Sequence, residues 1–433
     1  MAIQALLVIL AVLLVLLFLG VPISYAIAVS SLTAILSSID LNVAVLTAAQ
    51  RTFVGMSKFS LTAIPFFILA GNIMNQGGIA KRLVDFVMAI LGKMPGALLV
   101  TNIGTNALFG AISGSASAAA AAVGSMIRDG AEEQGYDPAV TAATNAASSC
   151  SGLLIPPSNA LITYSLASGG TSVAALFMAG YIPGIIWALC CCVVGVLLAV
   201  KLGYKGTPGK FDWKNLGICT LRALPSLSLI IVVIGGIIGG VFSATEGSAI
   251  AVVYALILAF CYRSINLKSL WKIIVDSAKM SGMVVFLVGV SNILGWVMAF
   301  LQIPDAVAAA LLSLTSNKYI ILLIMNVILL VSGTFMDVTP AILIFTPLFL
   351  PICQSFGMST IQFGLILVYN LCIGNITPPV GNALFVGIKV GRTSLSKVMP
   401  YMLMYYVAII GGLLLVTYIP AVSMALPQLT GLV

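Results

Sequence analysis

The sequence contains no histidine and few charged residues of either sign. Lys and Arg together number 19 and Asp and Glu 11, so only 7% of the 433 residues are charged, whereas 61% are hydrophobic. Soluble globular domains carry about 25% charged residues, so the composition indicates a polytopic membrane protein in a lipid bilayer. At ~20 residues per helical span, the chain is long enough for about ten crossings. The lack of histidine excludes His-ligated metal sites, Ser-His nucleophiles and His proton relays.

Other features of the composition exclude further classes of function. The net charge of +8 does not indicate a nucleic-acid partner, because basic residues in membrane proteins mostly mark the cytoplasmic ends of spans. The eight cysteines include no CxxC pair and lie mainly in apolar stretches, which predicts buried thiols rather than disulfides or a zinc site. Met1–Gly20 lacks a basic start and a small-residue cleavage site, so we expect a first membrane span and not a removed signal peptide.

The distribution of charge predicts a topology. The longest charge-free stretches, 138–200 and 338–388, must each contain at least two crossings. A connector at 201–222 has five basic residues and one acid, and such a loop is expected in the cytoplasm. Working outward from this linker places the amino terminus outside and all but three of the 19 basic residues on the cytoplasmic side. The three exceptions are Arg51, Lys58 and Lys318.

This topology predicts two halves in opposite orientations, each with scaffold helices, an arm, a re-entrant hairpin and a broken helix. The arms are expected to be interfacial helices at Phe53–Ile68 and Tyr262–Trp271. The expected boundaries are 1–60 for the first scaffold helices and arm, 61–200 for the first transport elements (hairpin at about 95–130, broken helix at about 138–168), 201–222 for the cytoplasmic linker, 223–278 for the second scaffold helices and arm, and 279–433 for the second transport elements (hairpin at about 319–351, broken helix at about 360–390) and the last span.

An internal repeat supports this organisation. The segment Ser148–Leu161 resembles Asn370–Leu384. An offset of 222 relates Cys150 to Cys372, Gly152 to Gly374 and Pro156-Pro157 to Pro378-Pro379, and Asn159 matches Asn382 after a one-residue insertion. Upstream, Ser113-Gly-Ser115 matches Ser332-Gly-Thr334 at an offset of 219. Inverted repeats with paired interruptions are typical of secondary transporters, whose substrate and ion sites lie at these interruptions. The predicted fold is therefore an all-α, inverted-repeat membrane protein with two re-entrant hairpins and two Pro-Pro-broken helices.

Each kind of interruption has a chemical interpretation and a structural alternative. Ser-Gly-Ser or Ser-Gly-Thr at a hairpin tip offers hydroxyl and carbonyl oxygens to a monovalent cation, whereas the alternative is a small-residue packing face. A Pro-Pro pair frees backbone carbonyls, and the adjacent Asn159 and Asn382 are uncharged groups that can bind a carboxylate or hydroxyl; the alternative is a simple kink. Because both interruptions occur twice, we favour the functional interpretation.

Asp337 is the only charged residue between Lys318 and Lys389. An ionisable residue at membrane depth indicates a functional site, where Asp337 can bind a cation, take up a proton or contact the substrate. The alternative is that it caps the helix that begins at Val-Thr-Pro, and the two roles are compatible.

Motifs spread over nearly the whole chain resemble the large membrane subunit of tripartite ATP-independent periplasmic (TRAP) transporters. They are Ile64–Met74, Ser113-Gly-Ser115, Ile155–Ser158, Leu176–Gly180, Thr245-Glu246, Met336–Pro340 and Thr377–Gly381. Each motif is weak by itself, and together they are specific. Many members of the family have an acid shortly after Ser-Gly-Ser, whereas this chain has Ala118–Ala122, which leaves Asp337 as the carboxylate of the hairpins.

The resemblance implies an elevator-type sodium symporter of the wider ion-transporter superfamily, in the bacterial inner membrane. It implies a small four-helix membrane subunit and a soluble periplasmic binding protein as partners, and organic anions such as C4-dicarboxylates and sialic acids as substrates. It also implies two Na+ sites. Carried over by motif, the first would comprise Ser113, Ser115, Gly152, Ile155 and Pro157, and the second Gly333, Thr334, Gly374, Thr377 and Pro379.

We therefore expect sodium-coupled uptake of a small organic anion, with Asn159, Asp337 and Asn382 contacting the substrate. One alternative is a stand-alone sodium–dicarboxylate symporter, which needs no binding protein. A second alternative is an intramembrane enzyme, which the sequence disfavours: a Ser protease needs histidine, and an aspartyl protease needs a second membrane Asp. A channel is disfavoured because the chain has no charged ring or carbonyl filter motif.

Overall fold

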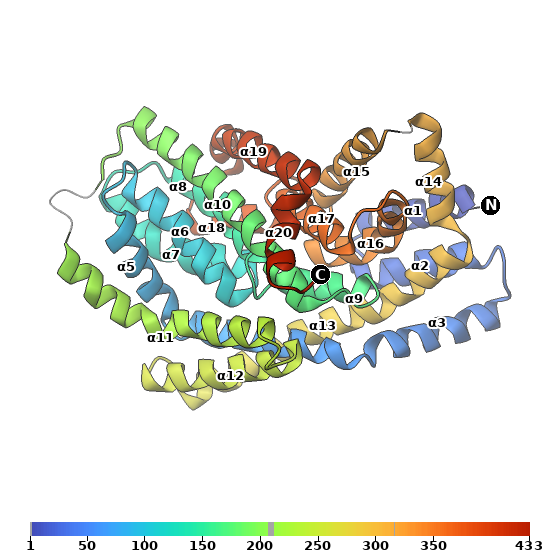
Figure 1. Cartoon of the computed structure of the whole chain (residues 1–433), viewed down its shortest axis with the longest axis horizontal. Helices are drawn as coiled ribbons and strands as arrows, with labels where there is room; N and C mark the ends of the chain where they lie inside the picture. Colours follow the sequence, from blue (N-terminus) through green and yellow to red (C-terminus); the bar gives the residue numbers. More distant parts are fainter. Residues whose placement is uncertain (1, 207–211, 316) are drawn as a thin grey trace.

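The computed structural model describes residues 2–206, 212–315 and 317–433 as α-helices with two short 3₁₀ segments, and no strand occurs in these ranges (Figure 1). The helices of the first half are α1 (Ala2–Phe18), α2 (Ile23–Ile35), α3 (Leu41–Met56), α4 (Ala63–Gln76), α5 (Ile79–Leu91), α6 (Ala97–Ser113), α7 (Ala116–Glu133), α8 (Pro138–Ser149), α9 (Asn159–Ala167) and α10 (Val173–Leu202), with the 3₁₀ segments η1 (Phe59–Thr62) and η2 (Cys150–Leu153).

The second half contributes ten further helices. They are α11 (Trp213–Ile238), α12 (Ala244–Cys261), α13 (Leu267–Phe300), α14 (Ile303–Leu314), α15 (Lys318–Gly333), α16 (Val338–Ser355), α17 (Thr360–Gly374), α18 (Asn382–Val390), α19 (Leu395–Tyr418) and α20 (Pro420–Leu429). Among the described residues, six helices are long and apolar enough to span a membrane, and the bent pair of α3 and α4 makes a possible seventh. Several other apolar helices are shorter than a span, as hairpins and broken helices require.

The repeat extends beyond the motifs that reveal it in the sequence. The helices α8 and α17 begin at Pro138 and Thr360, and α10 and α19 begin at Val173 and Leu395, so both pairs are 222 residues apart. The scaffold follows nearly the same spacing, since α2 begins at Ile23 and α12 at Ala244, 221 residues later. The two halves of the protein are therefore built from the same series of helices.

The arms differ from the interfacial helices that the sequence predicted. Phe53–Ile68 covers the end of α3, the segment η1 and the start of α4, and the chain bends by 59° there. Tyr262–Trp271 covers the end of α12 and the start of α13, which is one helix of 34 residues. Proline explains the difference: in a continuous first arm the Pro65 ring would clash with the carbonyl of Leu61, whereas α13 contains no proline.

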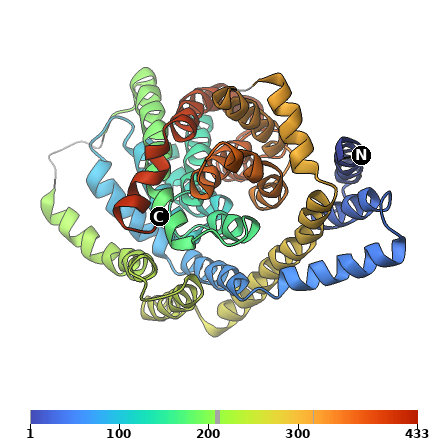
Figure 2. The same cartoon turned by 45° about the vertical axis from the view of Figure 1, so that its right-hand side comes forward.

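A frame and a core can be distinguished from the packing. The frame, α1–α5 with α11–α14, includes α3 and α13 side by side along one edge of the molecule (Figure 2). The core, α6–α10 with α15–α20, contains both hairpins, α6/α7 and α15/α16, and both broken helices, α8–η2–α9 and α17–α18. Frame and core meet mainly where α5 and α4 pack on α6, and where α13 and α14 pack on α16.

The two repeats interlock within the core. The first arm of each hairpin packs on the broken helix of its own repeat. In the first repeat α6 contacts α8 and η2, and in the second α15 contacts α17. The second half of each broken helix instead contacts the hairpin of the other repeat, α9 on α16 and α18 on α7. The equivalent residues Cys150 and Cys372 meet at the centre, with the Cys372 thiol 3.9 Å from the Cys150 carbonyl oxygen. The core is thus one body built from both repeats.

Buried asparagines hold each hairpin to its broken helix. The Asn106 side-chain amide on α6 donates to Asn145 Oδ1 on α8 at 3.1 Å. In the second repeat, the Asn370 amide on α17 donates to Asn326 Oδ1 on α15 at 2.9 Å. Such hydrogen bonds between membrane helices are worth about 0.6 kcal/mol on average, so these pairs fix the helix register more than they add stability.

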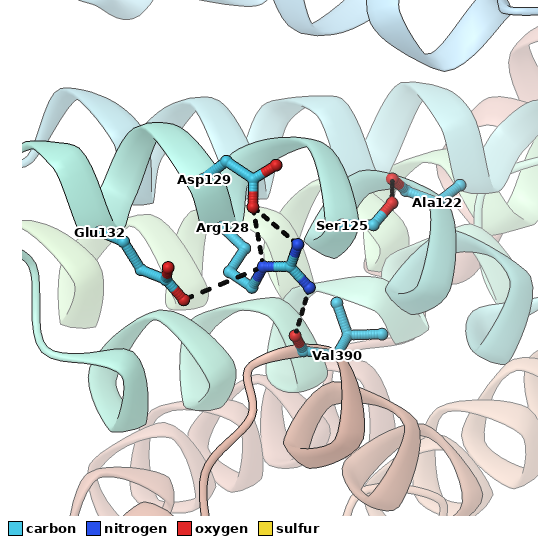
Figure 3. A network of polar contacts seen from close by, with 6 residues as sticks. All are labelled: Ala122, Ser125, Arg128, Asp129, Glu132 and Val390. Atoms are coloured by element: carbon cyan, nitrogen blue, oxygen red, sulfur yellow. Dashed lines mark hydrogen bonds and ion pairs between the residues drawn. The ribbon is translucent and has the colours of Figure 1, made fainter.

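Arg128 provides a further link at the opposite end of α7 from the hairpin tip (Figure 3). Its guanidinium donates two hydrogen bonds to Asp129 Oδ1, at 2.7 and 2.9 Å, and lies 3.9 Å from a Glu132 oxygen. It also donates to the Val390 carbonyl at 3.4 Å, at the carboxyl end of α18, where a cation is favourable. The first hairpin and the second broken helix are therefore joined at this end as well.

Paired glycines set the distance between the hairpins and the broken helices. A Cβ on Gly374 would lie 2.6 Å from Gly333 Cα, and a Cβ on Gly152 would lie 2.6 Å from the Gly110 carbonyl carbon. These are backbone contacts, which cannot relax as a side-chain tip would. Any side chain at these positions must push a hairpin away from its broken helix.

We predict that Gly374→Ala lowers the stability of the protein by roughly 1–3 kcal/mol, the usual cost of overpacking. The matched control is Gly411→Ala on α19, where nothing lies within 4 Å of an added Cβ, and which should be neutral or slightly stabilising. Thermal unfolding of the purified protein measures both changes. Equal midpoints for the two variants would contradict the close contact of Gly333 and Gly374.

Candidate functional site

The sequence interruptions meet at a cavity of about 180 Å³ between the core and the frame. Its polar lining comes from the core, namely Ser115, Ser117, Asn159, Thr163, Asp337, Thr339, Asn375 and Asn382. The frame contributes four apolar side chains, Ile64 and Ile68 from α4 and Met280 and Val284 from α13. None of the lining residues is a lysine or arginine.

Four helices begin at this cavity. The first residues of α7, α9, α16 and α18 all lie in its wall, namely Ala116, Asn159, Val338 and Asn382. Each helix amino terminus is equivalent to roughly half a positive charge, so the wall attracts anions although it has no basic side chain. The interruptions produce this arrangement because each one starts a new helix at the wall of the same cavity.

The four amino termini are not equally open. Ser115 and Ser158 cap α7 and α9, accepting hydrogen bonds from the backbone N–H of Ala118 and Leu161. In contrast, α16 and α18 have no side-chain cap. The second repeat therefore offers the less occupied backbone donors to a ligand.

Asp337 occupies the N-cap position of α16 without acting as a cap. Its backbone is extended, with φ −69° and ψ 161°, but its side chain makes no capping hydrogen bond. The residue at the corresponding N-cap of the first hairpin, that of α7, is Ser115, which does cap its helix. No ion pair involves Asp337 among the residues that the structure describes. Its exposed carboxylate therefore remains available at the cavity wall.

At the first hairpin tip, the structure brings Ser115 close to the proline break. The Asn159 amide donates to the Gly114 carbonyl at 3.4 Å, and a Cβ on Gly114 would lie 3.2 Å from the Pro157 carbonyl oxygen. The hydroxyls of Ser115 and Ser117 are 3.2 Å apart, and the Ser113 hydroxyl donates to the Ser115 carbonyl at 3.4 Å. Hydroxyl and carbonyl oxygens thus gather at this tip.

Gly152 and Ile155 have other neighbours. Gly152 packs on Gly110, before the tip of the hairpin, and Ile155 packs on α10, where a Cβ on Gly184 would lie 3.2 Å from the Ile155 nitrogen. Neither contact involves Ser113 or Ser115. Of the five residues predicted for the first cation site, Ser113, Ser115 and Pro157 are the ones that these contacts bring together.

The second tip is joined to its break through the backbone. The Val380 N–H donates to the Thr334 carbonyl at 3.1 Å, and Gly333 packs on Gly374. The Thr377 hydroxyl donates to the Ile373 carbonyl at 2.6 Å, so it stays beside the unwound turn. Residues Gly333, Thr334, Gly374 and the segment that follows Pro379 are therefore in contact. Both Pro-Pro peptide bonds, Pro156-Pro157 and Pro378-Pro379, are cis.

All three residues predicted to contact the substrate, Asn159, Asp337 and Asn382, line the cavity. The sequence prediction did not include Asn375, which is 6% exposed and has a side-chain oxygen with no partner among the described residues. A signal was present: the position equivalent to Asn375 at the offset of 222 is the apolar Leu153. A buried amide that only one repeat contains points to a role outside the shared fold.

The chain matches the model of the family described as "Tripartite ATP-independent periplasmic transporter, DctM component" over residues 10–422. It is 50% identical to the uncharacterised protein YgiK of Salmonella typhimurium, over 95% of this chain and 94% of that protein. It is 36% identical to the C4-dicarboxylate TRAP transporter large permease of Pseudomonas aeruginosa, over 93% of each chain. It is also 32% identical to the sialic acid TRAP transporter large permease of Vibrio cholerae, over 96% of each chain.

Among solved structures, the fold is similar to that of the YdaH transporter of Alcanivorax borkumensis, with a TM-score of 0.64 over 88% of this chain and 89% of that one. At 15% identity, this likeness concerns the fold alone. The family match covers the hairpins, both Pro-Pro breaks and the cavity between them. The chain therefore belongs to the DctM family of tripartite ATP-independent periplasmic transporters, and it is a multi-pass large permease of the bacterial inner membrane and not an enzyme.

Proposed function

We propose that this permease takes up a small organic anion together with Na+ by an elevator movement of the core against the frame. The observation that supports the proposal most strongly is the cavity at which four helix amino termini and one unpaired carboxylate meet. Relatives named for C4-dicarboxylates and sialic acid support an organic anion as the substrate.

The charges in the wall explain why an anion would need sodium. The helix termini attract an anion, but the Asp337 carboxylate lies in the same wall and repels it. A cation bound next to Asp337 would remove this repulsion and leave the favourable field of the helix ends. Binding of sodium and binding of the anion would then strengthen each other, which is the coupling that a symporter requires.

The proposed Na+ sites lie where each hairpin tip meets its Pro-Pro break. The first would use Ser113, Ser115, Gly152, Ile155 and Pro157, and the second would use Gly333, Thr334, Gly374, Thr377 and Pro379. The Thr334 carbonyl accepts one hydrogen bond, from Val380, and a carbonyl has a second lone pair. Neutral oxygens of this kind suit a hard cation such as Na+.

The two walls of the cavity support the elevator movement. Every polar lining residue belongs to the core, whereas the frame presents only Ile64, Ile68, Met280 and Val284. An apolar surface makes no directional contacts, so this wall of the cavity has no hydrogen bonds to break when the core slides past it. The substrate would remain on its polar ligands while the core moves.

We also propose two partners, a small four-helix membrane subunit and a soluble periplasmic binding protein. The matched family is described as one component of a tripartite transporter, and relatives of this chain are named large permeases. The alternative of a stand-alone sodium–dicarboxylate symporter shares the cavity and the repeat, so the requirement for a binding protein distinguishes the two.

The sodium proposal predicts that uptake into proteoliposomes falls by roughly tenfold or more when external sodium is replaced by choline. The reason is that Asp337 then repels the anion. Potassium replacement at equal ionic strength serves as the control for general salt effects. Uptake that continues unchanged in choline would refute sodium coupling.

Asp337→Asn is predicted to weaken the binding of sodium, because the variant removes the negative charge that attracts the cation. We expect a rise of roughly tenfold in the sodium concentration that gives half-maximal uptake. The matched control is Asp40→Asn, since Asp40 also stands at an N-cap without a capping hydrogen bond, but on the frame helix α3. Identical sodium curves for the two variants would exclude a role for Asp337 in coupling.

The partner proposal predicts that uptake requires the soluble binding protein. Proteoliposomes that contain this chain and the small subunit should take up substrate only when the liganded binding protein is added outside. Uptake of the free anion at a comparable rate without it would instead identify a stand-alone symporter.

A further inference from the structure

A second polar cleft lies between α5 and α11, which pack side by side in the frame (Figure 1). It consists of two adjoining cavities of about 330 and 390 Å³, which share Asp85 on α5 and Arg222 on α11. Its charged lining has four basic and two acidic residues, namely Lys81, Arg82, Lys93, Arg222, Asp85 and Asp212. None of these six residues lines the cavity between the hairpin tips. The α5–α11 cleft is therefore a separate site with an excess of positive charge.

The acids of the α5–α11 cleft do little to neutralise its cations. Asp212 is the N-cap of α11, and its carboxylate accepts hydrogen bonds from two backbone N–H groups of the first turn, both at 3.0 Å. Lys81, Asp85 and Arg222 are all exposed, and none of them forms an ion pair among the described residues. Cations that share a cleft without counterions repel one another. An anionic ligand would remove this repulsion.

Contacts at both ends of the cleft hold its walls in place. The Arg82 guanidinium lies over the ring of Tyr262, 3.2 Å from the ring centre, and so joins α5 to the end of α12. At the other end, the Gly96 N–H donates to the Tyr204 carbonyl at 3.1 Å. This hydrogen bond ties the start of the linker 201–222 to the turn between α5 and α6. The basic groups are therefore brought together by the fold itself, before any ligand binds.

The helix α5 has the character of a helix that lies at a membrane surface. Leu83 and Val87 are buried, whereas Lys81 and Asp85 on the opposite face are exposed. Such an amphipathic pattern is typical of helices in the interface between lipid and water. The adjacent linker 201–222 is basic, and the sequence predicts a cytoplasmic position for it. The cleft is thus expected at the cytoplasmic surface of the bilayer, at the depth of the lipid headgroups.

The face of α11 beside the cleft is apolar and exposed. Ile218 lies one helical turn before Arg222 on the same face of the helix and is 42% exposed, and the neighbouring Leu221 is 70% exposed. The cleft therefore places positive charge directly beside a surface suited to hydrocarbon. A soluble anion would contact only the charged part of this arrangement, whereas an amphiphile would contact both parts.

We propose that the α5–α11 cleft binds the phosphate headgroup of an anionic phospholipid, whose acyl chains lie along the exposed face of α11. Lys81 and Arg222 hold the phosphate from opposite walls, and the arginine fork can donate two parallel hydrogen bonds to it. Basic pockets between membrane helices on the cytoplasmic side are typical sites for such headgroups. Because α5 leads directly into α6, the lipid steadies the frame at the point where the first hairpin begins.

Thermal unfolding of the purified permease with its small membrane subunit, in detergent micelles, tests the proposal. The probes are dioleoyl-phosphatidylglycerol and dioleoyl-phosphatidylcholine, which have the same acyl chains and differ in headgroup charge. Inorganic phosphate and glycerol 3-phosphate serve as soluble probes of the same chemistry. We expect phosphatidylglycerol to raise the unfolding midpoint in a saturable manner, and the other three probes to leave it nearly unchanged.

Variants of the lining locate the site. The double variant Lys81→Gln/Arg222→Gln is expected to raise the phosphatidylglycerol concentration for half-maximal stabilisation by roughly tenfold or more, at about fivefold per basic residue. The matched control is Lys268→Gln/Lys272→Gln, which removes the same charge from exposed positions of α13 outside the cleft and should have little effect. Asp85→Asn should act in the opposite direction and lower that concentration by roughly fivefold, because it removes the acid that lines both cavities.

Four results would overturn the proposal. Phosphatidylglycerol may give no more stabilisation than phosphatidylcholine, or the cleft and control variants may weaken it equally, which indicates general attraction to anionic lipid. Soluble phosphates that stabilise the protein as strongly as the lipid would make the cleft a site for a soluble anion. Finally, Asp85→Asn may fail to strengthen binding. This last measurement does not depend on whether the double variant folds, which its unfolding midpoint without lipid establishes.

Discussion

A helix that is interrupted inside a bilayer exposes backbone groups that lipid cannot satisfy, and the rest of this structure depends on how these groups are accommodated. Four helices begin at one cavity, where a ligand and water can meet their free N–H groups. Two hairpin tips and two Pro-Pro breaks must therefore lie together. The packing of glycine on glycine at Gly110–Gly152 and Gly333–Gly374 brings each tip close enough to its break for this to occur.

The same constraint accounts for the scarcity of charge. Helix termini provide a positive field without the cost of burying a basic side chain, and the cavity has no lysine or arginine in its lining. Asp337 is the one fixed charge there, and it lies at the N-cap position whose equivalent in the first repeat is Ser115. This difference between the repeats gives the site one carboxylate.

Much of the site could be predicted from the sequence because the repeat doubles weak signals. One Ser-Gly-Ser or one Pro-Pro is ambiguous, whereas two copies at a constant offset identify the hairpins and the breaks. Asn159, Asp337 and Asn382, selected as residues beside these breaks, all line one cavity. The arms were less predictable, because Pro65 in the first turn of α4 prevents a continuous helix, whereas the equivalent segment continues through α13. The buried pairs Asn106–Asn145 and Asn326–Asn370 could not be predicted, because an asparagine in an apolar helix does not indicate which distant residue it contacts.

The sequence by itself determined the class of the protein, its repeat and its family, because composition, spacing and motifs are properties of the chain alone. Only the tertiary structure decided which interruptions share a cavity, that α9 and α18 each pack on the hairpin of the other repeat, and that Gly152 packs on Gly110 and Ile155 on α10. It also placed Asn375 in the wall, with a side-chain oxygen that has no partner among the described residues. The physical reason is that these properties depend on contacts between segments far apart in the chain, and helix periodicity carries no information about such contacts.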